Sequence, residues 1–146
     1  MADRPDSDAG PPLLTTILLI DPRDDERRYW AHRLTLCSSE YCVLEALDVE
    51  SGLHLYKTNA VDCVVVEMDL GAASGFSVLV SLVPLASQPE VPVVILTRLT
   101  NPYLCDLARL NGAQAALMKD RISGEDLDHA IRKAMAAVGP KKSRNR

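Results

Sequence analysis

The segment Val64-Val65-Val66-Glu67-Met68-Asp69-Leu70 decides the fold, because its apolar run stops abruptly at an acidic residue. Several apolar residues in a row, without alternation, predict a strand that is buried on both faces, as in the centre of a parallel sheet. Glu67 would then lie at the carboxyl end of that strand. Ligands bind at this edge of open α/β sheets, so Glu67 is the first candidate site residue.

Four further apolar segments predict strands on either side of this one in the sequence. Each is short, and each is followed by a polar residue or a turn: Thr15 to Ile20, Tyr41 to Leu47, Val91 to Thr97 and Gln114 to Met118. Together with Asp62 to Glu67 they make five strands. Segments with helical spacing of apolar residues separate them, and such alternation predicts a parallel sheet that is covered on both faces.

Residues suited to begin helices stand before these helical segments. We predict that Asp24 or Asp25 caps the first helix and that Asn101, followed by proline, caps the fourth. In the fourth helix, Leu104, Leu107 and Ala108 are expected to face inward. The boundaries of the helices follow from these caps.

Length and composition indicate one soluble domain. The chain has 146 residues, 47% of them hydrophobic, and a formal net charge of -4. The acidic segment 1–13 is predicted to be a disordered leader without a signal peptide, residues 14–138 the folded domain, and residues 139–146 a basic flexible tail. We expect a cytoplasmic protein, with no membrane contact. The acidic body argues against nucleic acid as a partner.

Four polar residues fall at the carboxyl ends of different predicted strands, and a doubly wound sheet would bring them to one edge. They are Asp21, Glu67, Thr97 and Lys119. Each alone has an ordinary structural explanation. Two acids, a hydroxyl and an amine together suit a phosphoryl site, in which carboxylates hold Mg²⁺ and the Lys and Thr side chains bind phosphoryl oxygens.

With these residues, the sequence resembles the receiver domain of two-component response regulators over about residues 14 to 138. The matching motifs are Leu18-Leu19-Ile20-Asp21, Glu67 with Gly75 eight residues on, Pro92 to Thr97, and Gly112-Ala113 leading to Lys119. The resemblance implies a flavodoxin-like (βα)5 sheet of strand order 2-1-3-4-5. It also implies a signalling surface on the last two helices and the strand between them.

Three residues depart from the pattern of that family. Glu67 stands where the family has the phosphoacceptor aspartate, and its extra methylene moves the carboxylate by about 1 Å, which can cost about 100-fold in an in-line reaction. Pro22 replaces the second of two adjacent acids, so Mg²⁺ binding by Asp21 and Glu67 would be weak or absent. Ala116 replaces the aromatic residue that moves together with the hydroxyl of Thr97.

Asp69 adds a third carboxylate to the acidic pocket of Asp21 and Glu67. Its first interpretation is a turn-forming acid, with phosphoryl acceptance or metal ligation as alternatives. Asp24 or Asp25 could also supply a carboxylate in place of Pro22. We further predict an ion pair between Lys119 and Glu67, worth up to about 1 kcal/mol if it is exposed.

The leading hypothesis is therefore a stand-alone, non-enzymatic receiver domain that works without phosphorylation and without a cofactor. Its expected partners are a histidine kinase or a separate output protein, and a homodimer through the signalling surface is left open. The alternative is a phosphorelay receiver that still accepts a phosphoryl group, with Mg²⁺, at Glu67 or Asp69. A phosphatase of the haloacid dehalogenase type, with Asp21 as nucleophile, lacks its second aspartate because Arg23 occupies that position.

Overall fold

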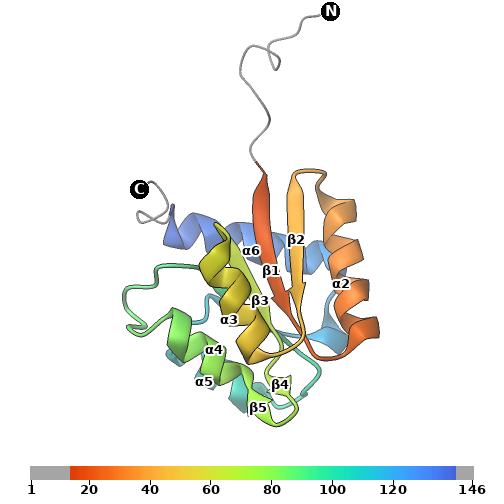
Figure 1. Ribbon diagram of the computed structural model, residues 1–146. Coiled ribbons are helices and arrows are strands. Elements are labelled where there is room, and N and C mark those ends of the chain that lie inside the picture. The colour runs from red at the N-terminus through yellow and green to blue at the C-terminus, as the bar shows by residue number, and fades with distance from the viewer. Residues whose placement is uncertain (1–13, 141–146) are drawn as a thin grey trace, which may run out of the picture.

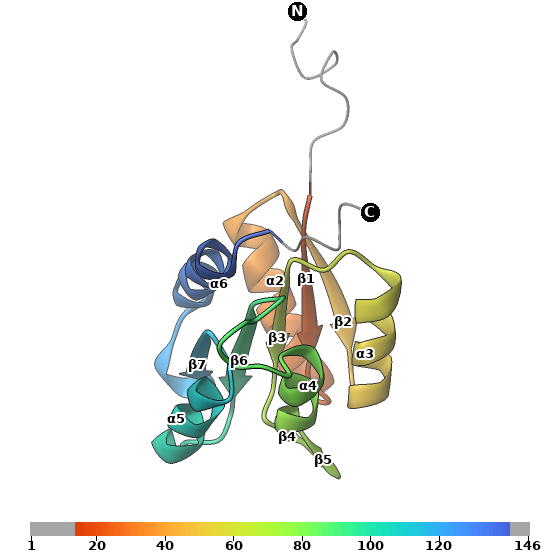
Figure 2. The same ribbon diagram turned by 90° about the vertical axis from the view of Figure 1, so that its left-hand side faces the viewer.

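The computed structural model describes residues 14–140, so the predicted leader and residues 141–146 of the predicted tail lie outside the described part. A five-stranded parallel sheet has the order β2-β1-β3-β6-β7, which confirms the predicted flavodoxin-like topology (Figures 1 and 2). Its strands are β1 (Thr15–Ile20), β2 (Tyr41–Ala46), β3 (Cys63–Val66), β6 (Val93–Thr97) and β7 (Ala115–Met118). The helices are α2 (Asp24–Cys37), α3 (Val49–Thr58), α4 (Gly75–Leu82), α5 (Pro102–Leu110) and α6 (Gly124–Val138).

Two apolar cores sandwich the sheet. Successive residues of β3 point to opposite faces, so Val64 and Val66 join the core under α3, α4 and α5, whereas Cys63 and Val65 join the core under α2 and α6. All four are buried. Figures 1 and 2 show the two helical layers on either side of the sheet. The continuous apolar run of β3 thus reflects burial from both sides, as predicted.

Of the two helix caps predicted above, Asn101 is confirmed and Asp24 or Asp25 is wrong. Asn101 caps α5 by accepting a hydrogen bond from the backbone of Tyr103, and Pro102 is the first helical residue. Helix α2 begins at Asp24 with Arg23 as its N-cap residue, and no side chain caps it. The backbone N–H of Arg23 instead donates to Asp21, so the aspartate two residues before Arg23 organises the turn.

The prediction for the inward face of α5 is confirmed at Ala108, but Leu104 is only partly buried and Leu107 is exposed. Cys105 and Ala108 are the buried residues of this helix, whereas Leu107 is exposed. The spacing of leucines and alanine fits more than one helical face, and the tight packing against β7 selects the face with the smaller side chains. The larger side chains Tyr103, Leu107 and Leu110 consequently lie on the outside.

A short antiparallel hairpin follows β3 and leads the chain into α4. It consists of β4 (Asp69–Leu70) and β5 (Ala73–Ser74), and its turn includes Gly71 in the left-handed region, with φ of 80°. Gly75 then opens α4 directly against the end of β3. A Cβ atom there would lie 2.4 Å from the carbonyl oxygen of Glu67, so only glycine fits this crossing.

This close approach makes Gly75 a sensitive position. We expect Gly75→Ala to reduce the free energy of unfolding by about 1–3 kcal/mol, because the backbone at Glu67 and Met68 must move away. Urea unfolding followed by circular dichroism measures the effect. Ser77→Ala, at an exposed position of the same helix, is the control and should change stability by less than about 0.5 kcal/mol. Equal stability of the two variants would contradict this account of the crossing.

Candidate functional site

The carboxyl edge of the sheet gathers the predicted polar residues. Asp21 follows β1, Glu67 follows β3, Thr97 ends β6, and Lys119 follows β7 in the short helix η1 (Lys119–Arg121). Asp21, Glu67 and Thr97 are three of the four buried polar or charged residues in the described part of the chain. The parallel topology therefore brings together residues from four strands at one cluster.

The Glu67 carboxylate is the centre of this cluster and is only 1% exposed. Its Oε2 accepts hydrogen bonds from the hydroxyl of Thr97 and from the backbone N–H of Asp69, the latter at 3.0 Å. Its Oε1 accepts one from the backbone N–H of Arg98 at 3.0 Å and pairs with the ammonium of Lys119 at 2.9 Å. Four donors from three chain segments thus share one carboxylate.

Lys119 connects three carboxylates. Besides Glu67, its ammonium lies 2.5 Å from Asp21 Oδ2 and 2.6 Å from Glu26 Oε1. The predicted Lys119–Glu67 ion pair is present, and it is buried rather than exposed, with side chains 9% and 0% accessible. Burial lowers the pKa of Lys119, but the hydrogen bonds to Asp21, Glu26 and Glu67 outweigh that effect and raise the pKa above its usual value.

Asp69 belongs to the rim of the cluster. Its Oδ2 pairs with the Arg23 guanidinium at 2.9 Å, and its Oδ1 accepts a hydrogen bond from the backbone N–H of Gly71 at 3.2 Å. The hydrogen bond from Gly71, with the charge of Arg23, lowers the pKa of Asp69. The carboxylate therefore shapes the turn before β5 and faces a cation.

Two residues of this site, Arg23 and Glu26, were not predicted from the sequence. Of the acids considered as substitutes at the start of α2, Asp24 pairs with Arg27 at 2.9 Å, and Asp25 accepts a hydrogen bond from the next backbone N–H of its own helix. Glu26 supplies the additional carboxylate instead. A helical turn separates Arg23 from Glu26, so both can face the sheet edge, and this spacing was the available signal.

Ala116 and Tyr103 both lie away from the carboxylates. Ala116 is buried within β7, in the core on the α5 side of the sheet. Tyr103, an aromatic residue of α5, is 70% exposed. The structure brings Thr97 and Lys119 to Glu67, but it brings no aromatic side chain to them from these two positions.

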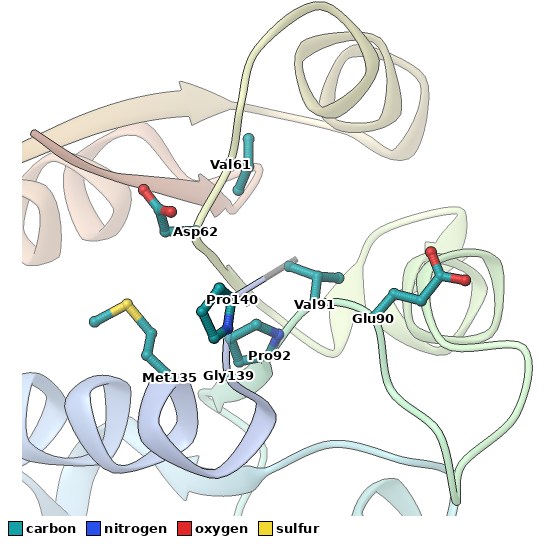
Figure 3. Close-up of a pocket in the computed structure, with 8 residues that line it drawn as sticks. All are labelled: Val61, Asp62, Glu90, Val91, Pro92, Met135, Gly139 and Pro140. Atoms are coloured by element: carbon teal, nitrogen blue, oxygen red, sulfur yellow. The ribbon is translucent and has the colours of Figure 1, made fainter. Parts of the chain in front are cut away.

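A pocket at the other end of the sheet is lined by two acidic residues, Asp62 and Glu90, among apolar ones (Figure 3). Asp62 and Pro92, just before β3 and β6, line it with Met135 of α6 and with Pro140. The Asp62 carboxylate accepts a hydrogen bond from the backbone N–H of Thr16 at 2.8 Å, so it helps to hold β1. The candidate site therefore remains at the carboxyl edge.

Comparison with known proteins identifies the family. Residues 17–132 match the family described as response regulator receiver domain, which is most of the chain. The chain belongs to the response regulator receiver domain family. Members of this family are signalling modules. No curated protein sequence matches the chain.

Solved structures of receiver domains share this fold. A response regulator receiver domain protein from Clostridium thermocellum is 25% identical, with a TM-score of 0.73, and the match covers 85% of this chain and 96% of that one. A response regulator from Burkholderia pseudomallei, solved with a phosphorylated aspartic acid, calcium and citrate, is 23% identical, with a TM-score of 0.71 and coverage of 85% and 70%. A CheY-like receiver domain from Methanospirillum hungatei is 18% identical, with a TM-score of 0.73 and coverage of 86% and 96%. The latter two likenesses concern the fold alone.

The receiver fold implies a divalent cation at this edge, and the residues present do not fit one as they are arranged. Asp21, Glu26 and Glu67 offer oxygen atoms within 4.8 Å of one another, a spacing at which carboxylates could share a cation. The Lys119 ammonium already lies against all three of these carboxylates.

Within residues 14–140, no helix is long and apolar enough to cross a membrane.

Replacement of Lys119 should strongly reduce the free energy of unfolding of this receiver domain. We expect Lys119→Met to reduce the free energy of unfolding by about 3–5 kcal/mol near pH 7, because it leaves buried carboxylates without their cation. The raised pKa of Lys119 means that its contribution is complete below about pH 10.4 and is lost as the pH rises through the higher folded-state value. The stability gap between wild type and variant should therefore close in strong alkali.

Urea unfolding of both proteins at a series of pH values measures this gap. Lys133→Met is the matched control, since Lys133 is exposed on α6, and it should leave stability nearly unchanged at every pH. A gap that stays constant above pH 11 would show that the charge of Lys119 does not act as described.

Proposed function

We propose that this receiver domain works without phosphorylation and signals by binding a protein partner. The observation that supports this proposal is that both oxygens of the Glu67 carboxylate already have hydrogen-bond or ion-pair partners. Attack on a phosphodonor needs an oxygen with a free lone pair and an in-line approach. Both oxygens of Glu67 are engaged by Thr97, Lys119 and two backbone N–H groups, and the group is buried. Nucleophilic reaction of Glu67 would first require these contacts to break.

The same contacts favour a single fixed arrangement of the loops. The Thr97 hydroxyl also accepts a hydrogen bond from the backbone N–H of Leu99, so the loop after β6 is held to Glu67 through one side chain. By resemblance to the family, Thr and Lys at these positions are the groups that bind phosphoryl oxygens. Here a permanent carboxylate engages them. Ala116 has no aromatic ring that could move together with the Thr97 hydroxyl between two conformations.

The proposed contact surface comprises α5, β7 and α6. Tyr103, Leu107 and Leu110 recur at i, i+4 and i+7 on α5, so they form one stripe, and all three are exposed. Exposed apolar side chains that gather on one helix mark interaction sites more often than scattered ones do. The partner class is a signalling protein, such as a histidine kinase or a separate output protein. We place this non-enzymatic activity in the cytoplasm.

Intact-mass analysis after incubation with acetyl phosphate, with and without Mg²⁺, tests the loss of phosphorylation. We expect no increase in the mass of the wild-type protein, because no oxygen of Glu67 is free to attack. A receiver domain that carries the usual aspartate is the positive control, and Glu67→Asp reports whether a shorter carboxylate restores the chemistry. A Mg²⁺-dependent gain by the wild type would overturn the proposal and establish a phosphorelay receiver. Loss of that gain in Asp69→Asn would then assign Asp69 as the acceptor.

The surface has its own test. We expect the protein to self-associate at high concentration through the α5 stripe, and Leu110→Lys to prevent this, because a charge would be buried in the contact. Sedimentation velocity over a range of concentrations measures the effect. Leu36→Lys is the matched control, since Leu36 is similarly exposed, at 64% against 76% for Leu110, but lies on α2. A wild-type protein that stays monomeric would exclude the homodimer, and equal effects of both variants would exclude the stripe as the contact.

A further inference from the structure

The guanidinium of Arg23 lies among oxygen atoms from two segments of the site, the one that follows β1 and the one that follows β3. Its Nη2 pairs with Asp69 Oδ2 at 2.9 Å, and its Nη1 donates to the carbonyl oxygen of Asp69 at 3.2 Å. The same Nη1 lies 3.8 Å from Asp21 Oδ1 and 3.8 Å from Glu67 Oε1. One nitrogen thus faces two carboxylates and a backbone carbonyl.

This set of oxygens is of the kind that binds hard divalent cations. Mg²⁺ takes carboxylate, carbonyl and water oxygens and is commonly held by only one or two carboxylates. Lys119 lies against other oxygens of the cluster, Asp21 Oδ2 and Glu26 Oε1, and meets Arg23 only at Glu67 Oε1. The two cations therefore share Asp21 and Glu67, while Lys119 also pairs with Glu26 and Arg23 also pairs with Asp69.

We propose that Arg23 is the resident cation of this site and excludes divalent metal ions from it. A guanidinium stays protonated at every physiological pH, so its charge is permanent. A metal ion that approached Asp21, Glu67 and the Asp69 carbonyl would meet this charge and would have to displace the side chain. The proposal concerns the same site as the proposed function, but it does not depend on whether Glu67 can accept a phosphoryl group.

The chain before α2 holds Arg23 in place. Its backbone N–H donates to Asp21 Oδ1 at 3.0 Å, and the preceding Pro22 has a fixed φ angle. The side chain is only 22% exposed and is anchored at its tip by both the carboxylate and the carbonyl of Asp69. The side chain is thus fixed at both ends, as a permanent component of the site would be.

Titration with Mg²⁺ in the absence of any phosphodonor tests this role. The only tryptophan, Trp30, lines a surface pocket together with Glu26 and Lys119, so its fluorescence reports on the site. We expect no saturable change for the wild type at millimolar Mg²⁺. Arg23→Met should bind Mg²⁺ about tenfold or more tightly than wild type, because it removes a positive charge within a few ångströms of the ion. Mg²⁺ should also raise the melting temperature of that variant.

Arg98→Met is the matched control. The Arg98 side chain is exposed and lines the same pocket, whereas only its backbone N–H contacts Glu67. Arg98→Met removes one positive charge, as Arg23→Met does, but it leaves Arg23 in contact with Asp21, Glu67 and Asp69. The Mg²⁺ affinity of Arg98→Met should therefore stay close to that of the wild type. Equal gains in Arg98→Met and Arg23→Met would overturn the proposal, as would tight Mg²⁺ binding by the wild type or none by Arg23→Met. Phosphoryl uptake by the wild type, measured separately, would instead contradict the proposed function.

Discussion

The buried carboxylate of Glu67 is the constraint on which the rest of the site depends. An ionised group that is removed from water costs several kcal/mol unless charges and hydrogen bonds replace its hydration. Here the replacement comes from the ends of β3, β6 and β7, through the Asp69 N–H, the Thr97 hydroxyl with the Arg98 N–H, and Lys119. Three loops that are distant in sequence are therefore tied to two oxygen atoms. Their conformations are coupled, because a shift of any one loop leaves a charge less well satisfied.

Charge balance extends this coupling to β1 and α2. Asp21 shares Lys119 with Glu67 and Glu26, and it orders the turn that leads into α2 by accepting the N–H of Arg23. Arg27 then donates to the carbonyl oxygen of Asp21 and pairs with Glu45 on β2, both at 2.9 Å. Cations of the chain itself thus contact the carboxylates of this edge and offset part of their negative charge.

The fold could be predicted from the sequence where buried segments show a regular pattern of apolar residues. Continuous apolar runs such as Val64 to Val66 predicted strands between two helical layers, and the parallel topology then required Asp21, Glu67, Thr97 and Lys119 to meet. The sequence pattern did not show which further side chains extend into the site. Arg23 and Glu26 join the site because α2 begins one residue earlier than an aspartate cap would allow, and that start depends on a hydrogen bond from the turn to Asp21. Similarly, the packing of Cys105 and Ala108 on β7, rather than the leucine spacing, set the outward face of α5.

A molecular switch needs two states whose populations a ligand can shift, and the ligand must bind one of them better. In the proposed function, Glu67 acts as an internal ligand, because it is part of the chain and is therefore always present. It binds Thr97 and Lys119, the groups that in the family bind phosphoryl oxygens. Its effective concentration is fixed by the fold, so the free energy that favours the engaged state is constant. A partner that recognises α5, β7 and α6 would then always meet the same surface. Regulation would have to act on the amount of the protein or on access to that surface, and not on the chemistry of the sheet edge.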